Sequence, residues 1–222
     1  IGCNDLILFY DNGSNPSFKG MIKDSNFKYH RKEKNMYVNP AWNEIFDLVE
    51  TKYLTLLNND CFIQSSDYFT DILPHMEQNE IVISSCKTKN IKSYNLFNQI
   101  YYRIKFERNI FQPKYGFNSK PLEFSSTARR QGWLMTINLE IYKTLDYKIP
   151  SYLKVWYGDD WIWSQIILNN LNYSLYKNRY ALHIKSSSTS NVSNIIQDDI
   201  KNIKKHGDWY KRITDTMHNK KY

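Results

Sequence analysis

Short apolar runs alternate with segments of helical spacing along this chain, and the alternation limits its fold more than any other feature. The strand-like runs are residues 6–10, 53–57 and 81–83. A helix with Asn39 as N-cap and Pro40 at its first position is predicted between the first two runs. A second helix, over residues 67–73, is predicted to end before Pro74. Strands that alternate with helices in this way are typical of α/β sandwiches.

The second half of the chain returns to regular elements after a weakly patterned stretch. Residues from about 87 to 130 are predicted to form a partly irregular insertion rather than a second domain. After it we expect regular segments over residues 132–137, 139–145 and 173–184, and a helix with Asp159 in its first turn. The tail over residues 194–222 is expected to form one or two amphipathic helices packed on the core, with membrane-surface binding as an alternative.

Composition indicates a globular protein with anionic partners. The chain has 222 residues, 41% of them hydrophobic and 16% aromatic, which excludes a disordered chain and allows a full core. The formal charge of +8 favours partners such as nucleotide diphosphates, nucleic acid or acidic lipid headgroups. We predict one main domain over residues 1–190 and a helical tail over residues 191–222.

Cysteine usage and hydropathy indicate a reducing compartment. The three cysteines, Cys3, Cys61 and Cys86, are widely spaced and odd in number, which argues against a disulfide framework and a CxxC zinc site. No apolar run approaches the roughly 18 residues that span a bilayer, and the start has no signal-peptide layout. We expect a cytoplasmic protein, with peripheral membrane association as an alternative, and the missing initiator Met suggests a missing upstream segment.

Asn58, Asn59 and Asp60 abruptly end the apolar run over residues 53–57. Open α/β sheets bind their ligands at the carboxyl ends of strands. A carboxylate and two amides there provide hard oxygen ligands for Mg²⁺ or Mn²⁺ against a nucleotide diphosphate. The alternative is an ordinary polar turn, because Asn and Asp are common turn residues.

Two adjacent acids near residue 160 have the chemistry of a general base. Asp159 and Asp160 repel each other, which raises the proton affinity of one, while a helix N-terminus opposes this effect. One of them can therefore remain an ionised base near neutral pH. The alternative is that both acids only stabilise the start of the helix. Further on, Lys185 and the serine run at residues 186–190 offer groups that can close over phosphate oxygens.

Four segments together resemble the GT-A glycosyltransferases, and most closely glycosyltransferase family 2. They are LILFYDNGS at residues 6–14, VNPAWNEIFDLVETKYLTLLNND at residues 38–60, GWLM at residues 132–135, and GDDW at residues 158–161 followed by His183. The resemblance implies a Rossmann-like α/β sandwich with a mixed central sheet, its donor half over about residues 1–86 and its acceptor half over about 130–190. The chain starts almost at the family's second strand, so either the usual first strand and helix are lacking or the sequence is truncated.

The resemblance also assigns roles to residues. Asp60 and His183 would hold one divalent cation, Mn²⁺ or Mg²⁺, and Asp160 would be the catalytic base beside Asp159. The implied donor contacts are Asp11, which would recognise the base, and Asn12, Asn39, Asn58, Asn59 and Lys185. The implied acceptor side is Gly132, Trp133 and Trp161. Asn58 departs from the family pattern, because it replaces the first acid of the DXD-type motif and removes one charge.

The predicted function is an inverting, metal-assisted glycosyltransferase of the hexosyltransferase type. It would move a sugar from a nucleotide-diphosphate donor, with UDP favoured, to a glycan, a lipid-linked glycan or another hydroxyl acceptor. Two alternatives from other classes stay open. One is a noncatalytic GT-A-like binding or structural module, and the other is a nucleic-acid-binding protein, including an enzyme that glycosylates DNA.

Overall fold

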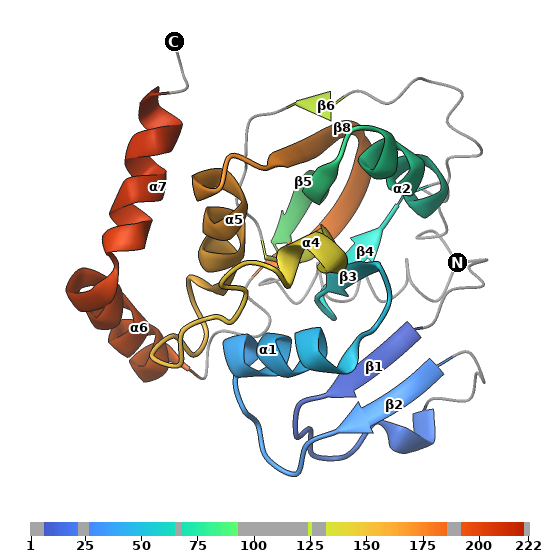
Figure 1. The fold of residues 1–222 in the computed structure, drawn as a ribbon. Helices are drawn as coiled ribbons and strands as arrows, with labels where there is room; N and C mark the ends of the chain where they lie inside the picture. The colour runs from blue at the N-terminus through green and yellow to red at the C-terminus, as the bar shows by residue number, and fades with distance from the viewer. Residues whose placement is uncertain are drawn as a thin grey trace.

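A mixed sheet of six strands forms the centre of the computed structural model, which describes residues 7–21, 27–64, 68–92, 124–125, 132–185 and 192–219 (Figure 1). Its strands, in spatial order, are β3 (Tyr53–Leu57), β7 (Leu134–Asn138), β5 (Ile81–Lys92), β8 (Asn172–Lys185) and β4 (Cys61–Ile63), with β6 (Phe124–Ser125) also paired to β8. Only β5 and β8 pair in parallel, and the other neighbours are antiparallel. The predicted mixed sheet is confirmed.

Helices cover both faces of this sheet because the side chains of β7 alternate between them. Met135 and Ile137 face the larger core, which includes side chains of α1 (Val38–Leu48), α5 (Gly158–Leu168) and α7 (Asp208–Asn219). Leu134 packs in a second cluster with α2 (Tyr68–Gln78). The short helix α4 (Leu139–Tyr142) follows β7 directly, and α6 (Ser193–His206) precedes α7. Within the described residues, no helix combines the length and apolar character needed to cross a membrane.

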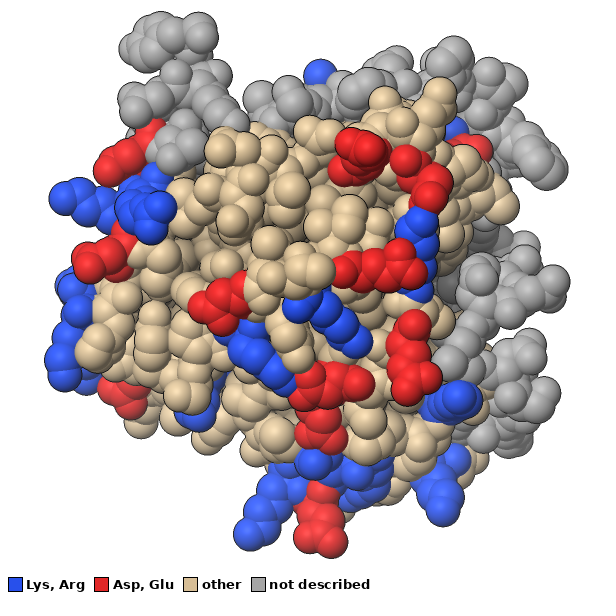
Figure 2. All heavy atoms as spheres, in the orientation of Figure 1, with Lys and Arg blue, Asp and Glu red and all other residues tan. Residues whose placement is uncertain are grey.

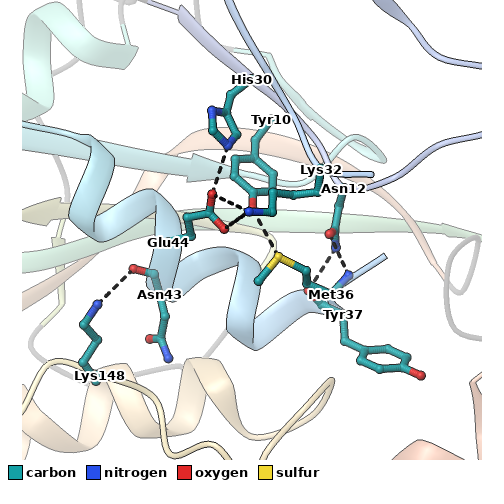
Figure 3. A network of polar contacts seen from close by, with 9 residues as sticks. All are labelled: Tyr10, Asn12, His30, Lys32, Met36, Tyr37, Asn43, Glu44 and Lys148. Carbon is teal, nitrogen blue, oxygen red and sulfur yellow. Dashed lines mark hydrogen bonds and ion pairs between the residues drawn. The ribbon is translucent and has the colours of Figure 1, made fainter. Parts of the chain in front are cut away.

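The first strands form a separate two-stranded parallel sheet, β1 (Ile7–Asp11) with β2 (Phe27–Arg31), with the 3-10 helix η1 (Lys19–Met21) between them in sequence. Glu44 of α1 joins this sheet to the main body (Figure 3). Its carboxylate accepts hydrogen bonds from Tyr10 of β1 at 3.0 Å and Lys32 at 3.1 Å, and contacts His30 Nε2 of β2 at 2.9 Å. The half-buried carboxylate of Glu44 therefore joins both small strands to α1.

Several predicted boundaries were wrong. Helix α1 begins at Val38 rather than at Pro40, and its N-cap is Tyr37 instead of Asn39. Helix α2 continues through Pro74 to Gln78. A proline inside a helix costs about 3 kcal/mol, and here the burial of Tyr68, Ile72 and Met76 along one face outweighs that cost.

Two further predicted boundaries were also wrong. Helix α4 has four residues and ends at Tyr142 rather than near residue 145, because turns follow it. Strand β5 continues to Lys92, past the predicted start of the irregular insertion at residue 87. Most of that insertion lies outside the described residues.

A large bulge divides β8 into two halves. Cys86 of β5 pairs with Tyr176, but the next residue, Lys87, pairs with Tyr180, so β8 carries three extra residues at this point. Arg179 in the bulge is 2% exposed, and its Nε donates to Asp71 Oδ2 of α2 at 2.9 Å. The ion pair thus fixes the bulge against α2, and β8 beyond it continues beside β4.

Replacing Asp71 is expected to destabilise the fold, because it removes the carboxylate that pairs with a buried guanidinium. We expect Asp71→Ala to lower the free energy of unfolding by about 2–4 kcal/mol, measured by urea denaturation. The control is Asp198→Ala, whose pair with Lys201 is largely exposed and should contribute less than about 1 kcal/mol. Equal small losses in both variants would contradict a stabilising role for the Arg179 pair.

Candidate active site

Asp60 and His183, far apart in sequence, lie close together at one edge of the sheet. A tight turn follows β3, in which Asn58 N–H donates to Trp133 O and Cys61 N–H donates to Asn58 O, both at 3.0 Å. The turn delivers Asp60 to the start of β4, where Cys61 pairs opposite His183 of β8. His183 Nε2 lies 3.6 Å from Asp60 Oδ1, and the two residues are 9% and 7% exposed.

This pair fits a divalent cation that is held partly by a phosphate-bearing ligand. Carboxylate and imidazole groups are both established ligands of divalent metals. Among the described residues, no third His, Cys, Asp or Glu joins them to complete a protein-only metal site. Cations such as Mg²⁺ are commonly bound by one or two protein groups, with phosphates and waters as the remaining ligands.

Trp133 fixes the orientation of the His183 ring. The indole and the imidazole stack with centroids 4.5 Å apart and an interplanar angle of 12°. The indole itself is anchored, because its Nε1 donates to Thr88 Oγ1 of β5 at 2.9 Å. Trp133 was predicted on the acceptor side, and the structure places it against the candidate metal pair.

Gly132 connects this cluster to the two acids of α5. A Cβ atom at Gly132 would lie 3.0 Å from both Asp159 Cβ and Trp42 Cη2, so a larger residue here would force these neighbours to shift. The first turn of α5 contains Asp159 and Asp160, as predicted. Residues 132–133 therefore lie against Asp159 of α5 on one side and against His183 on the other.

Asp11 organises the loop after β1 through internal contacts. Its carboxylate accepts hydrogen bonds from Ser14 N–H at 2.8 Å and Tyr29 OH at 2.5 Å, and Arg31 lies 3.3 Å away. Burial alone would raise the pKa of Asp11, but the hydrogen bonds from Tyr29, Ser14 and Phe18 lower it to about 2. The predicted contact between Asp11 and the nucleotide base stays a prediction.

The other predicted donor contacts have varied surroundings. Asn12 accepts from Met36 N–H at 2.9 Å and donates to Tyr37 O at 3.0 Å, which ties the loop to the start of α1. Asn39 is fully buried and donates to Trp156 O at 3.0 Å, which ties α1 to the loop before α5. Asn58 and Asn59 lie in the turn before Asp60. The Lys185 side chain and residues 186–190 lie outside the described part of the chain.

Trp161, which was predicted on the acceptor side, is largely buried. It is 7% exposed, packs in the main core and contacts Trp209 of α7 edge to face at 5.0 Å. Helix α5 is buried at every position from Trp161 to Ile167, so Trp161 lies in the core together with its neighbours. Trp163 is also a core residue, with no exposed surface.

Two residues at the site were missed by reasoning from the sequence. Thr88, which anchors Trp133, lies in a segment whose pattern gave no strand. Asp199, which contacts the loop before α5, lies on the same helical stripe as the apolar Ile196 and Ile203. An acid at an apolar position of an amphipathic helix indicates a buried carboxylate that needs hydrogen-bond partners, but it does not identify those partners.

A cavity of about 560 Å³ lies at the other end of the sheet. Its lining includes Tyr53 at the start of β3, Asn138 at the end of β7 and Asn172 at the start of β8. Asp60 follows the opposite end of β3. The cavity is therefore separate from the candidate active site.

A family model and solved structures both match this chain. The model described as glycosyl transferase family 2 matches residues 2–145. The structure of GalNAc-T7 with UDP, GalNAc and Mn²⁺ matches with a TM-score of 0.61 and 13% identity, over 94% of this chain and 43% of that chain. Two structures of S. aureus TarS 1-349, one of them with UDP-GlcNAc, match at 13% identity with TM-scores of 0.57 and 0.55.

The TarS matches cover 89% of this chain and 56% and 57% of those chains. The chain therefore spans less than half of GalNAc-T7 and little more than half of TarS 1-349. No curated protein matches the sequence. The structural likeness confirms the predicted GT-A fold.

The carboxylate of Asp11 should make stability depend on pH. An aspartate in an unfolded chain has a pKa of about 3.9, whereas the folded value is about 2. Its stabilisation is therefore complete above about pH 5 and is lost as the pH falls toward 2. We expect Asp11→Asn to lower the unfolding free energy at pH 7 by about 2 kcal/mol, and the gap to the parent to shrink at pH 3. Urea denaturation at several pH values measures this, and a gap independent of pH would contradict it.

Proposed function

The chain belongs to glycosyl transferase family 2, and on that premise we propose that it transfers a sugar from a nucleotide-diphosphate donor to an acceptor hydroxyl. The observation that carries the proposal is the contact of residues 132–133 with both parts of the candidate site. Trp133 stacks on His183 beside Asp60, and Gly132 packs on Asp159. Two adjacent residues thus connect the pair that would hold the diphosphate with the helix that carries the proposed base.

Asp60 and His183 are the residues that would hold one divalent cation, Mn²⁺ or Mg²⁺, against the diphosphate. Such a cation, when bound, stabilises the negative charge that the leaving diphosphate acquires. Trp133 would support metal binding by keeping the His183 imidazole in one orientation. The indole can do so because its hydrogen bond to Thr88 fixes its own position. Outer contacts of this kind orient metal-binding histidines in many proteins.

Asp160 is the proposed catalytic base, with Asp159 beside it. Its carboxylate would take the proton from the acceptor hydroxyl as the acceptor oxygen forms a bond to the anomeric carbon. The bond from that carbon to the diphosphate oxygen breaks at the same time, and the nucleoside diphosphate leaves with the bonding electrons. Attack from the face opposite the leaving group inverts the anomeric centre.

The donor is proposed to be a UDP-hexose or a related UDP-sugar. GalNAc-T7 was solved with UDP, GalNAc and Mn²⁺, and TarS was solved with UDP-GlcNAc, which supports this choice of donor class. A glycan, a lipid-linked glycan or another hydroxyl compound would be the acceptor. The face shown in Figure 2 gives less support to nucleic acid, because Lys and Arg are interspersed there with Asp and Glu instead of forming one basic field.

Removing the Asp60 carboxylate should abolish metal-dependent donor binding. In a thermal-shift panel of UDP, GDP, TDP and CDP sugars, we expect one nucleotide to stabilise the parent only when Mn²⁺ is present. At a hundred times the Kd the gain is about 2.7 kcal/mol, which corresponds to several degrees in Tm. Asp60→Ala should lose this gain, whereas Asp198→Ala, on the exposed face of α6, should keep it. An undiminished shift in Asp60→Ala would exclude Asp60 as a metal ligand.

Replacing the proposed base should slow turnover without abolishing donor binding. Asp160→Asn keeps the size of the side chain but removes its basic oxygen, so we expect kcat to fall by about 10²–10⁴-fold. Release of UDP from the donor and an acceptor panel measures this, with the thermal shift as a check on donor binding. If the parent releases no UDP with any donor and acceptor, and Asp160→Asn behaves identically, the protein is a noncatalytic GT-A-like module.

A further inference from the structure

The loop that leads into α5 is held by a carboxylate from the C-terminal tail. Asp199 of α6 is 1% exposed, and its two oxygens accept three successive backbone N–H groups. Lys154 N–H donates to Oδ1 at 2.8 Å, and the N–H groups of Val155 and Trp156 donate to Oδ2 at 2.7 and 2.8 Å. Hydrogen bonds to an ionised acceptor are about twice as strong as neutral ones. These three bonds fix the path of the loop over residues 154–156.

Asn39 of α1 binds the same loop through the carbonyl groups of the loop. The backbone N–H of Asn39 donates to Lys154 O at 3.0 Å, and its side-chain Nδ2 donates to Trp156 O at 3.0 Å. Its Oδ1 also lies against Gly158, where a Cβ atom would come within 2.0 Å of it. The N–H groups of the loop therefore bind the tail, while its carbonyl groups bind α1.

The end of this loop has a backbone conformation that needs such support. Tyr157, the N-cap of α5, has φ 64° and ψ 5°, which is the left-handed region. A residue with a Cβ atom in a sparsely populated region costs about 1 kcal/mol or more, and persists where its surroundings impose it. Tyr157 O accepts the first helical hydrogen bond of α5 from Trp161 N–H at 2.9 Å. The direction of the first turn of α5, with both acids, thus depends on the loop.

We propose that Asp199 is a positioning residue for transfer, which sets the place of the Asp159 and Asp160 carboxylates by holding the loop before α5. The inference rests on the proposed function, but it assigns a role to the tail, which lies beyond the segment matched by the family model. Asp199 touches the backbone of residues 154–156 and acts on the acceptor through α5. Donor binding at Asp60 and His183 uses β4 and β8 and does not require Asp199.

The tail has other contacts that keep it in place when Asp199 is changed. Asn202 donates to Tyr152 O at 2.8 Å, Ile213 belongs to the main core, and Ile203 and Trp209 pack on it. A variant at Asp199 should therefore release the loop before α5 while the tail stays packed on the core. Asn202→Ala is the matched control for docking, and Asp198→Asn is the matched control for charge, because Asp198 is the exposed neighbour of Asp199.

The first experiment compares kcat and KM in Asp199→Asn with those in the parent and both controls. We expect kcat per folded enzyme to fall by about ten- to a hundredfold, while the donor KM and the Mn²⁺ affinity change by less than about twofold. Mn²⁺ affinity is measured without donor by electron paramagnetic resonance, and the folded fraction by circular dichroism. The two controls should keep the parent kcat. An unchanged kcat in Asp199→Asn, or an equal fall in Asn202→Ala, would overturn the proposal.

The second experiment needs no turnover. Hydrogen exchange followed by mass spectrometry should show faster exchange in Asp199→Asn for peptides that cover residues 154–161, and unchanged exchange for β3 and β8. Equal exchange in the variant and the parent at residues 154–161 would overturn the proposal whatever the enzyme assay shows. A parent that releases no UDP, with accelerated exchange in the variant, would refute the proposed function and the role of Asp199 in transfer while leaving the loop contact established.

Discussion

Antiparallel pairing between β4 and the second half of β8 is the contact on which the candidate site depends. It sets Cys61 opposite His183, and so brings Asp60, the residue before β4, within 3.6 Å of the His183 ring. The pairing exists because the three-residue bulge lets β8 continue beyond its first half. Backbone hydrogen bonds between strands, rather than any contact of the two side chains, therefore create the pair of ligand groups.

The charge of that pair suits a cation that arrives with its substrate. Asn58 stands where two-acid motifs have a carboxylate, so the turn after β3 supplies one full negative charge, that of Asp60. A single carboxylate attracts a free divalent cation less strongly than two do. In the proposed reaction a diphosphate would supply the remaining charge, and a protein with a formal charge of +8 favours such an anion. With Asn58 in the turn, part of the cation's stabilisation would come from the donor rather than from the protein.

The sequence predicted the parts of the site that local chemistry determines. Asn58 to Asp60 end an apolar run, and Asp159 and Asp160 precede a helical pattern, so both groups could be predicted without a structure. The continuation of α2 through Pro74 could not be predicted, because the burial that outweighs the cost of the proline comes from strands distant in sequence. The same holds for the burial of Trp161, because α5 is covered on nearly every side by elements that are distant in sequence. For Asp199, the apolar position on α6 could be recognised in the sequence, but its partners could not, because they are backbone N–H groups of another segment.

The contact of Asp199 with the loop also orders events during synthesis of the chain. Translation completes the sheet and the Asp60–His183 pair once β8 has emerged, whereas the loop over residues 154–156 gains its acceptor only when residue 199 follows. Chains fold progressively from the N-terminus as they are made. A nascent chain would accordingly complete the Asp60–His183 contact before the loop that leads into α5 is held in place.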